Sequence, residues 1–259
     1  MTVMLSRRGL LGGALAVTLL PKRLPAQPPS SGLEALIARN TEARGGAAAL
    51  DRVHACLIEL DINERGQTIR GRYAAHEDGL VRIDIFVGGN LVYREGVDRA
   101  GVWQWPGDAA APSPSNADGA ANALLHGAEN HLFGLHRFRE RGHQLRLMPS
   151  ERIDSIEYPV IEIVYSTGHK SYFYVDPATW LFARRRDERA YHPDVDTTRQ
   201  RVETRYLDYQ AVDGVVAAHR NLDIDLDTGA VLSTNQVTRR TLNPVLLPTN
   251  LFDRGYRRG

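Results

Sequence analysis

Residues 54–87 read HACLIELDINERGQTIRGRYAAHEDGLVRIDIFV, and this stretch decides the fold. Its two ends place an apolar side chain at every second position: Cys56, Ile58, Leu60, Ile62, Val81, Ile83, Ile85 and Val87. Successive side chains of a β-strand point to opposite faces, so this period of two predicts strands with one apolar face. Gly66 and Gly79 separate the runs at hairpin distances. The stretch therefore predicts an antiparallel sheet with one face toward water.

Strands also dominate the C-terminal part of the chain. Six further segments continue the pattern: 160–167, 170–176, 181–191, 198–210, 215–227 and 230–241. The whole chain then has about ten strands, with no helix between most neighbours. Parallel neighbours need a long crossover connection, usually a helix, so this order indicates an antiparallel meander.

Two helical regions accompany the strands. Leu33, Leu36 and Ile37 repeat at helical spacing before the glycine pair at 45–46, and residues 47–53 predict a short second helix. A third helix interrupts the strands, and its apolar face consists of Ala121, Leu124, Leu125, Ala128, Leu132 and Leu135. An inserted helix of this kind can cover the open face of a curved sheet. No second domain boundary is evident, so we expect residues 27–259 to form one domain.

The charge of the chain is unevenly distributed. The whole sequence has 32 basic and 31 acidic residues, but residues 1–26 hold four of the basic ones and no acidic one. Residues 27–259 therefore carry 28 basic against 31 acidic groups, a net charge of −3. A mildly acidic protein has no electrostatic reason to bind nucleic acid, so we expect no such partner. The single cysteine, Cys56, excludes an intrachain disulfide and is most simply a core residue.

Residues 1–26 have the composition of a cleavable signal peptide. Arg7 and Arg8 precede an apolar run over residues 9–20 that is too short for a permanent membrane span, and Ala26 closes a cleavage site. The segment 6–11, SRRGLL, resembles a twin-arginine export signal, while an ordinary Sec signal is the alternative. No cysteine lies near the end of the run, so we expect a soluble periplasmic protein without a lipid anchor.

Catalytic and metal motifs are weak in this sequence. His126, His131 and His136 are spaced five apart, which rotates each by about 140° from the last, so they do not share one helix face. Residues 223–229 resemble half a calcium loop but lack its required Gly and Glu, so we interpret them as a strand with its aspartates facing outward. Serine-hydrolase and nucleotide-binding motifs are missing from the sequence. We therefore expect no catalytic residue, no metal and no cofactor.

Five segments together carry a resemblance to a known family. They are residues 40–46 followed by Leu50, 98–101 followed by Trp103, 172–177 followed by Leu181, 206–215, and 251–252. The segment 206–215, YLDYQAVDGV, carries the resemblance most strongly. In this order, the segments resemble the outer-membrane lipoprotein-sorting (LolA-like) family over nearly the whole length after residue 33.

The resemblance implies a half-open, strongly curved antiparallel β-barrel whose N-terminal and inserted helices form a lid over an apolar concavity. It also implies a monomeric carrier, not an enzyme, which takes lipid or lipoprotein acyl chains from a membrane donor complex to an outer-membrane acceptor. Strand alternation and the inserted helix supply the residues expected to line the cavity: Ile58, Leu60, Ile62, Ile83, Ile85, Trp103, Trp105, Leu124, Leu125, Leu132, Phe133, Ile161, Ile163 and Phe173.

Two other classes of function stay open at this point. Remote relatives of the family serve as stress-signal sensors, and one relative of the fold is an enzyme. A carrier should show a cavity too large for core packing. An envelope sensor should bind a protein partner, and an enzyme should show polar groups that converge inside the cavity.

The export signal gives the first testable prediction. Replacing Arg7 and Arg8 by lysines should block export, because the twin-arginine route requires the paired arginines. Fractionation of cells that express the wild type and the double variant would measure this. Unchanged export of the lysine variant would instead assign the leader to the Sec route.

Overall fold

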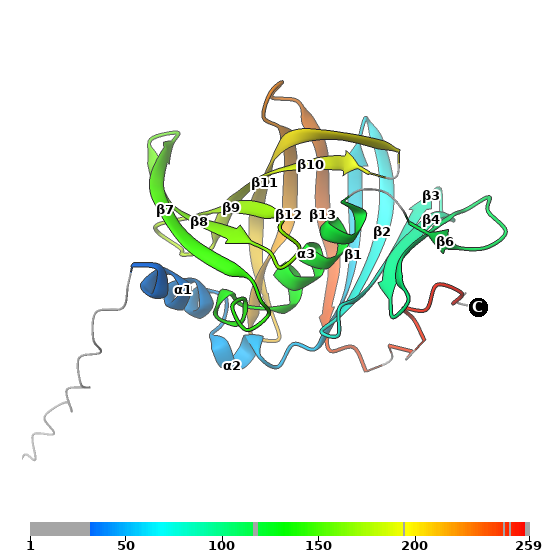
Figure 1. Ribbon diagram of the computed structural model, residues 1–259, viewed down its shortest axis with the longest axis horizontal. Helices are drawn as coiled ribbons and strands as arrows, with labels where there is room; N and C mark the ends of the chain where they lie inside the picture. Colours follow the sequence, from blue (N-terminus) through cyan, green and yellow to red (C-terminus); the bar gives the residue numbers. More distant parts are fainter. Residues whose placement is uncertain (1–31, 116–118, 194, 246, 249, 257–259) are drawn as a thin grey trace, which may run out of the picture. The chain divides into compact units, whose positions relative to one another are not determined.

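The structure is a computed structural model that describes residues 32–115, 119–193, 195–245, 247–248 and 250–256 (Figure 1). Its strands are β1 (Ala55–Glu64), β2 (Gln67–His76), β3 (Leu80–Val87), β4 (Asn90–Asp98), β5 (Gly101–Pro106), β6 (Ser113–Pro114), β7 (Gln144–Ile153), β8 (Ile156–Val164), β9 (Lys170–Val175), β10 (Phe182–His192), β11 (Asp196–Val212), β12 (Val215–Asp225) and β13 (Val231–Leu242). Its helices are α1 (Gly32–Ala43), α2 (Ala47–Leu50), α3 (Ala120–Leu132) and a short 3₁₀ helix, η1 (Leu135–Arg137). The expected signal peptide, residues 1–26, lies outside the described residues.

All described strands belong to one antiparallel sheet in the order β6-β5-β4-β3-β2-β1-β13-β12-β11-β10-β9-β8-β7. The first and last strands of the chain pair with each other in the middle of the sheet, where Cys56 lies opposite Leu242. The two sheet edges, β6 and β7, are consecutive in sequence and do not pair with each other. The sheet is therefore not closed into a barrel, and the connection from β6 to β7 contains α3.

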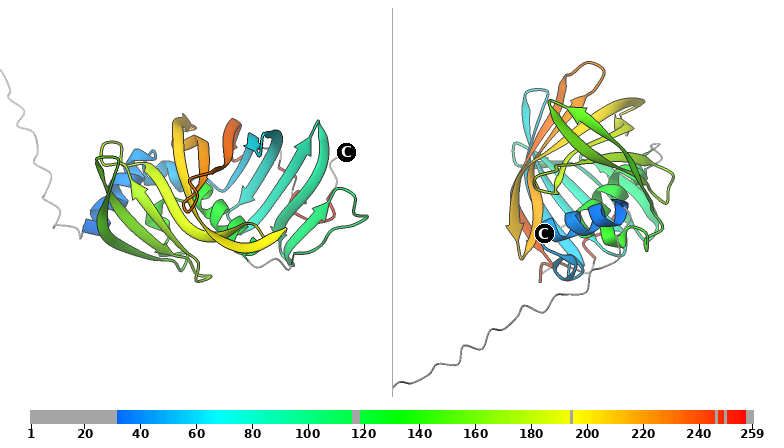
Figure 2. Two further views of the ribbon diagram at one scale, coloured as in Figure 1. Left: turned by 90° about the horizontal axis from the view of Figure 1, so that it is seen from above. Right: turned by 90° about the vertical axis from the view of Figure 1, so that its left-hand side faces the viewer.

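The curved sheet holds its main core on the face that the helices cover. Figures 1 and 2 show α3 lying against the concave face of the sheet. The largest buried cluster joins Ile58, Ile161 and Phe173 of the sheet to Leu124 and Leu132 of α3, together with residues of α1 and α2. We call this cluster the concave core. Smaller clusters lie elsewhere, and one of them contains Ala74, Leu251 and Phe252.

The sequence-based fold prediction is confirmed: the protein is mainly β, with an open antiparallel sheet and an inserted helix. The described residues form thirteen strands, however, and not about ten. The strand β2 has a weak apolar pattern because its most buried positions are the small residues Gly71, Ala74 and Ala75. The edge strand β7 is mostly exposed, so it too lacks a clear alternation.

Two isoleucines of β8 should contribute differently to the free energy of unfolding, because one lies in the concave core and the other does not. Ile161 is completely buried, whereas Ile156 is 41 % exposed. Replacing Ile161 by alanine should lower the free energy of unfolding by about 2–5 kcal/mol, because it leaves a cavity. Replacing Ile156 by alanine should change it by less than about 1 kcal/mol. Urea unfolding measures both, and equal losses would contradict the assignment of Ile161 to the core.

Candidate functional site

The structure brings most of the predicted cavity residues together. Ten of the fourteen lie in the concave core or pack against it: Ile58, Leu60, Ile83, Leu124, Leu125, Leu132, Phe133, Ile161, Ile163 and Phe173. Ile62 and Ile85 lie outside the core and are half-buried. They flank Gly71, which pairs with Leu60 on one side and with Ile85 on the other. A methyl group added at Gly71 would lie only 3.2 Å from Ile62 Cδ1, so the side chain of Ile62 packs closely over this glycine.

The two predicted tryptophans are not part of this group. Trp103 and Trp105 alternate with Val102, which packs against the concave core, so their side chains lie on the other face of β5. The guanidinium of Arg82 lies 5.9 Å from the ring centre of Trp103, and that of Arg94 lies 4.3 Å from the ring of Trp105. Period-two alternation shows that two side chains share a face but does not say which face is concave. The placement of both tryptophans in the cavity is therefore corrected.

The apolar part of the concave face is packed and not open. Ile161, Ile163 and Phe173 are completely buried, and Leu124 and Leu132 of α3 cover the same core. The helix begins after Gly119, whose positive φ of 86° suits glycine, and no side chain caps it. An apolar ligand can therefore reach this surface only if α3 moves away from it.

A partly open cavity of about 170 Å³ lies between α3 and strands β9–β13. Ten of its sixteen lining residues have polar side chains, and the full lining is Arg44, Gly127, Asn130, His131, Phe173, Phe182, Arg185, Thr204, Tyr206, Tyr209, Ala217, Ala218, Asn221, Asp223, Val237 and Arg240. We call it the arginine cavity, after Arg44, Arg185 and Arg240. Sequence analysis predicted Phe173 as a cavity residue but missed the three arginines, and it placed Asp223 on the outside although this carboxylate is buried and lines the cavity.

The three arginines differ in their partners. Arg185 forms an ion pair with Asp187 at 3.1 Å. Arg44 Nη1 donates to the carbonyl of Phe133 at 2.9 Å, at the C-terminal end of α3. Arg240 donates to the carbonyl of Ala218 at 3.4 Å, and its Nε has no hydrogen-bond partner in the described part of the chain. Among the described residues, neither Arg44 nor Arg240 has a carboxylate within ion-pair distance.

These charges act on one another and on His131. Burial lowers the pKa of Arg44, and the nearby charge of Arg240 lowers it further. Burial likewise lowers the pKa of Arg240. Burial and the charges of Arg240, Arg44 and Arg185 lower the pKa of His131 to about 3. His131 is therefore neutral at pH 7, and the cavity keeps its positive charge on the arginines.

A second polar network holds the middle of α3 to the turn between β8 and β9. Glu129 accepts hydrogen bonds from His143 at 3.0 Å and Arg141 at 3.2 Å, and it lies 3.3 Å from His126 Nδ1. His126 Nε2 lies 2.8 Å from Thr167 Oγ1. Burial acts to raise the pKa of Glu129, but the hydrogen bonds from the two histidines outweigh it and lower this pKa to about 2. Glu129 is thus a half-buried anion that ties α3 to the segments before β7 and after β8.

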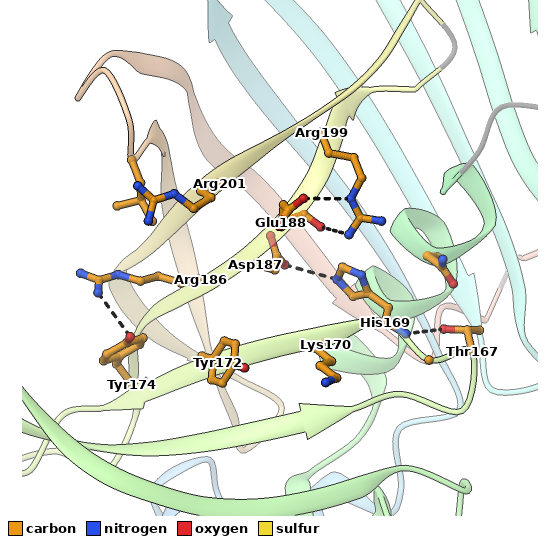
Figure 3. A pocket seen from close by; sticks show the side chains of 13 residues that line it. Thr167, His169, Lys170, Tyr172, Tyr174, Arg186, Asp187, Glu188, Arg199 and Arg201 are labelled. Carbon is orange, nitrogen blue, oxygen red and sulfur yellow. Dashed lines mark hydrogen bonds and ion pairs between the residues drawn. The ribbon is translucent and has the colours of Figure 1, made fainter.

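Two further cavities lie beside the arginine cavity and share lining residues with it or with each other. A neighbouring cavity of about 130 Å³ shares Gly127 and Arg185 with it. That cavity in turn shares His169 and Asp187 with an open pocket of about 660 Å³. Figure 3 shows His169 and Asp187 pointing toward each other at this mouth, and their side chains lie 3.6 Å apart.

The described residues show neither a membrane-spanning helix nor a cluster of metal-binding side chains. No helix in the described ranges is long and apolar enough to cross a membrane. The same residues contain no group of three or more histidine, cysteine, aspartate or glutamate side chains that could hold a metal ion. His126, His131 and His136 lie in three separate surroundings, since His136 pairs with Asp51.

Comparison with solved structures identifies the fold. A DUF1329 family protein from Desulfovibrio piger is 12 % identical, with a TM-score of 0.57 over 86 % of this chain and 98 % of its own. A LolA superfamily protein from Nitrosomonas europaea is 14 % identical, with a TM-score of 0.56 over the same shares. A putative outer-membrane lipoprotein-sorting protein domain from Vibrio parahaemolyticus is 13 % identical, with a TM-score of 0.54 over 84 % of this chain and 94 % of its own.

These likenesses confirm the predicted resemblance at the level of the fold: the chain has a LolA-like fold. No family model and no curated protein sequence matches the chain. The identities of 12–14 % mean that the comparisons describe the fold and not the chemistry of the site.

The lowered pKa of His131 predicts a loss of stability in acid. Folding favours its neutral form, so its contribution is complete above about pH 6.5 and is lost as the pH falls toward about 3. Between pH 7 and pH 5 the free energy of unfolding should fall by roughly 1–2 kcal/mol from this group. Replacing His131 by glutamine should remove that part of the loss. Urea unfolding at both pH values measures it, and an unchanged pH dependence in the variant would contradict the assignment.

Proposed function

We propose that the protein is a periplasmic carrier that holds lipid or lipoprotein acyl chains on its concave face, beneath α3. The observation that carries the proposal is the position of α3, whose leucines lie on the most apolar surface of the sheet. The likeness to a solved lipoprotein-sorting domain supports the same function. In this proposal α3 occupies the place of the acyl chain while the carrier is empty.

The energies of burial favour such an exchange. Leu124 and Leu132 are buried in the concave core, and two buried leucines contribute about 3–6 kcal/mol. An acyl chain gains about 0.8 kcal/mol per buried methylene, so a chain of about 14 methylenes gains about 11 kcal/mol. A long chain can therefore displace the helix, and a short one cannot.

The polar contacts of α3 set a threshold for its displacement. Glu129 holds the middle of the helix, and Arg44 holds its C-terminal end. Opening must expose or replace these hydrogen bonds, each of which stabilises the closed form by about 1–3 kcal/mol because a charged group takes part. These contacts keep α3 closed without a ligand, and a longer acyl chain offsets more of their energy than a shorter one does.

A pair of substitutions on β3 tests this proposal. Ile83 packs partly against the concave core, whereas Val87 on the same strand is 44 % exposed. Replacing Ile83 by aspartate should lower the affinity for a fluorescent long-chain fatty acid at least tenfold, because the charge must be desolvated beside the chain. The Val87→Asp control should bind as the wild type does. Thermal melts followed by circular dichroism would show that both variants are folded.

Hydrogen exchange provides an independent readout of the lid. Amides of α3 should exchange faster when the fatty acid is bound, while those of β1 and β13 should keep their protection. A wild-type protein that binds no acyl lipid would overturn the carrier proposal. In that case an envelope sensor that binds a protein or lipid signal on the same fold becomes the better explanation, and capture of a specific protein partner would support it.

A second candidate, a hydrolase, is favoured by one observation. The hydroxyl of Thr167, the imidazole of His126 and the carboxylate of Glu129 follow one another at 2.8 and 3.3 Å, which is the order of a nucleophile, its base and an orienting acid. Burial lowers the pKa of His126, so the ring is neutral at pH 7. Turnover of a p-nitrophenyl acyl ester that disappears in Thr167→Val would establish this function. Binding without turnover is the outcome that the carrier proposal expects.

A further inference from the structure

The arginine cavity carries more positive charge than its acidic neighbours balance. Asp187 contacts both Arg185 and Arg189, and Asp223 lies 3.5 Å from Arg189. These two carboxylates therefore balance two arginines. Arg44 and Arg240 remain without a carboxylate among the described residues, so two positive charges stay uncompensated inside the protein.

Both uncompensated arginines are deeply buried. Arg44 is 7 % exposed and Arg240 is 9 % exposed. A buried charge without a counter-ion is strongly unfavourable, and natural proteins keep such groups where they have a function. Arg44 at least donates to the carbonyl groups at the end of α3. The Nε of Arg240 has no hydrogen-bond partner in the described chain, and its side chain lines the cavity.

The size of the cavity limits what can bind there. At about 170 Å³ it is much larger than the space needed for one water molecule but smaller than a pocket for a complete small-molecule ligand. It therefore has room for a compact charged group and not for an acyl chain. Guanidinium groups bind phosphate and carboxylate oxygens with two parallel hydrogen bonds, which suits a small oxyanion.

The cavity also borders the apolar surface directly. Arg240 on β13 lies opposite Ile58 on β1 in the pairing of the two strands. Phe173 and Val237 line the cavity and also belong to the concave core or pack against it. A molecule with an anionic head and an apolar tail can thus place its head among the arginines and its tail along the concave core.

We propose that Arg44, Arg185 and Arg240 bind the oxyanion headgroup, a phosphate or a carboxylate, of the amphiphile whose chain occupies the concave face. The inference rests on the proposed carrier function and adds the chemical class of its ligand. It selects anionic amphiphiles against neutral ones of the same chain length.

Calorimetric titration of the wild-type protein with four ligands tests the inference. Dodecyl phosphate and dodecanoate are used below their critical micelle concentrations and dodecanol below its solubility limit, and inorganic phosphate is the fourth ligand. At least one anionic amphiphile should bind about tenfold or more tightly than dodecanol, because charge-assisted hydrogen bonds form only with the anion. Inorganic phosphate should bind more weakly than dodecyl phosphate, because it lacks the tail.

Two neighbouring arginines of β13 give a matched pair of variants. Arg240→Met removes the buried charge and keeps the volume, while Arg239→Met removes an exposed charge on the other face of the strand. Arg240→Met should lower the affinity for the anionic amphiphiles to that for dodecanol, and Arg239→Met should retain the wild-type preference. Should Arg240→Met fail to fold, the ligand series on the wild type decides alone.

Each contrary outcome shows which claim is wrong, the headgroup site or the carrier function. Equal binding of dodecanol and both anions would overturn the headgroup site and leave the carrier function standing. Inorganic phosphate that binds as tightly as dodecyl phosphate would mean a site for a free anion, which also overturns the inference. An equal loss in Arg239→Met would assign the preference to general surface charge. Binding of no amphiphile at all would overturn the carrier function itself.

Discussion

The pairing of β1 with β13 is the contact on which the rest of the structure depends. It joins residues almost 190 positions apart, such as Cys56 and Leu242, and places the two halves of the chain side by side in one sheet. Because each half then runs outward as a meander, the two edges β6 and β7 are consecutive in sequence. The chain must cross from one edge to the other, and α3 lies on that connection. The strand order thus requires a connection between the two edges, and α3 is part of it.

The concave face has two chemically different parts, and α3 contacts both. Leu124 and Leu132 cover the apolar part, whereas His131 faces the arginine cavity. The apolar contacts are non-directional, so an acyl chain can replace them with little penalty. The hydrogen bonds of Glu129 and Arg44 depend on direction, so each is lost completely when α3 moves away. Helix α3 therefore has apolar contacts that another apolar group can replace and hydrogen bonds that require one defined position of the helix.

The sequence predicts the fold better than it predicts the site. Alternation in residues 54–87 predicts the sheet and the inward position of Ile58 and Ile83, because one apolar face repeats at period two. It cannot assign Trp103 to a face, since an alternating pattern shows which side chains share a face and not which face is concave. It also misses Arg185 and Asp223, because buried charges carry no apolar signal. The strand β10, FARRRDERAYH, did contain a clue, since charges on both faces of a strand inside a sheet indicate a polar interior.

The boundary between the two parts of the concave face has a consequence for specificity. Since Ile58 and Arg240 are paired across two hydrogen-bonded strands, the apolar surface and the positive charge are held at a fixed separation by the backbone. In the proposed carrier, a neutral chain gains only the apolar contacts and leaves the charges of Arg44 and Arg240 uncompensated. An anionic amphiphile gains the same contacts and also neutralises charges that the closed protein buries at a cost. Discrimination therefore comes as much from the unfavourable state of the empty cavity as from the strength of the new hydrogen bonds.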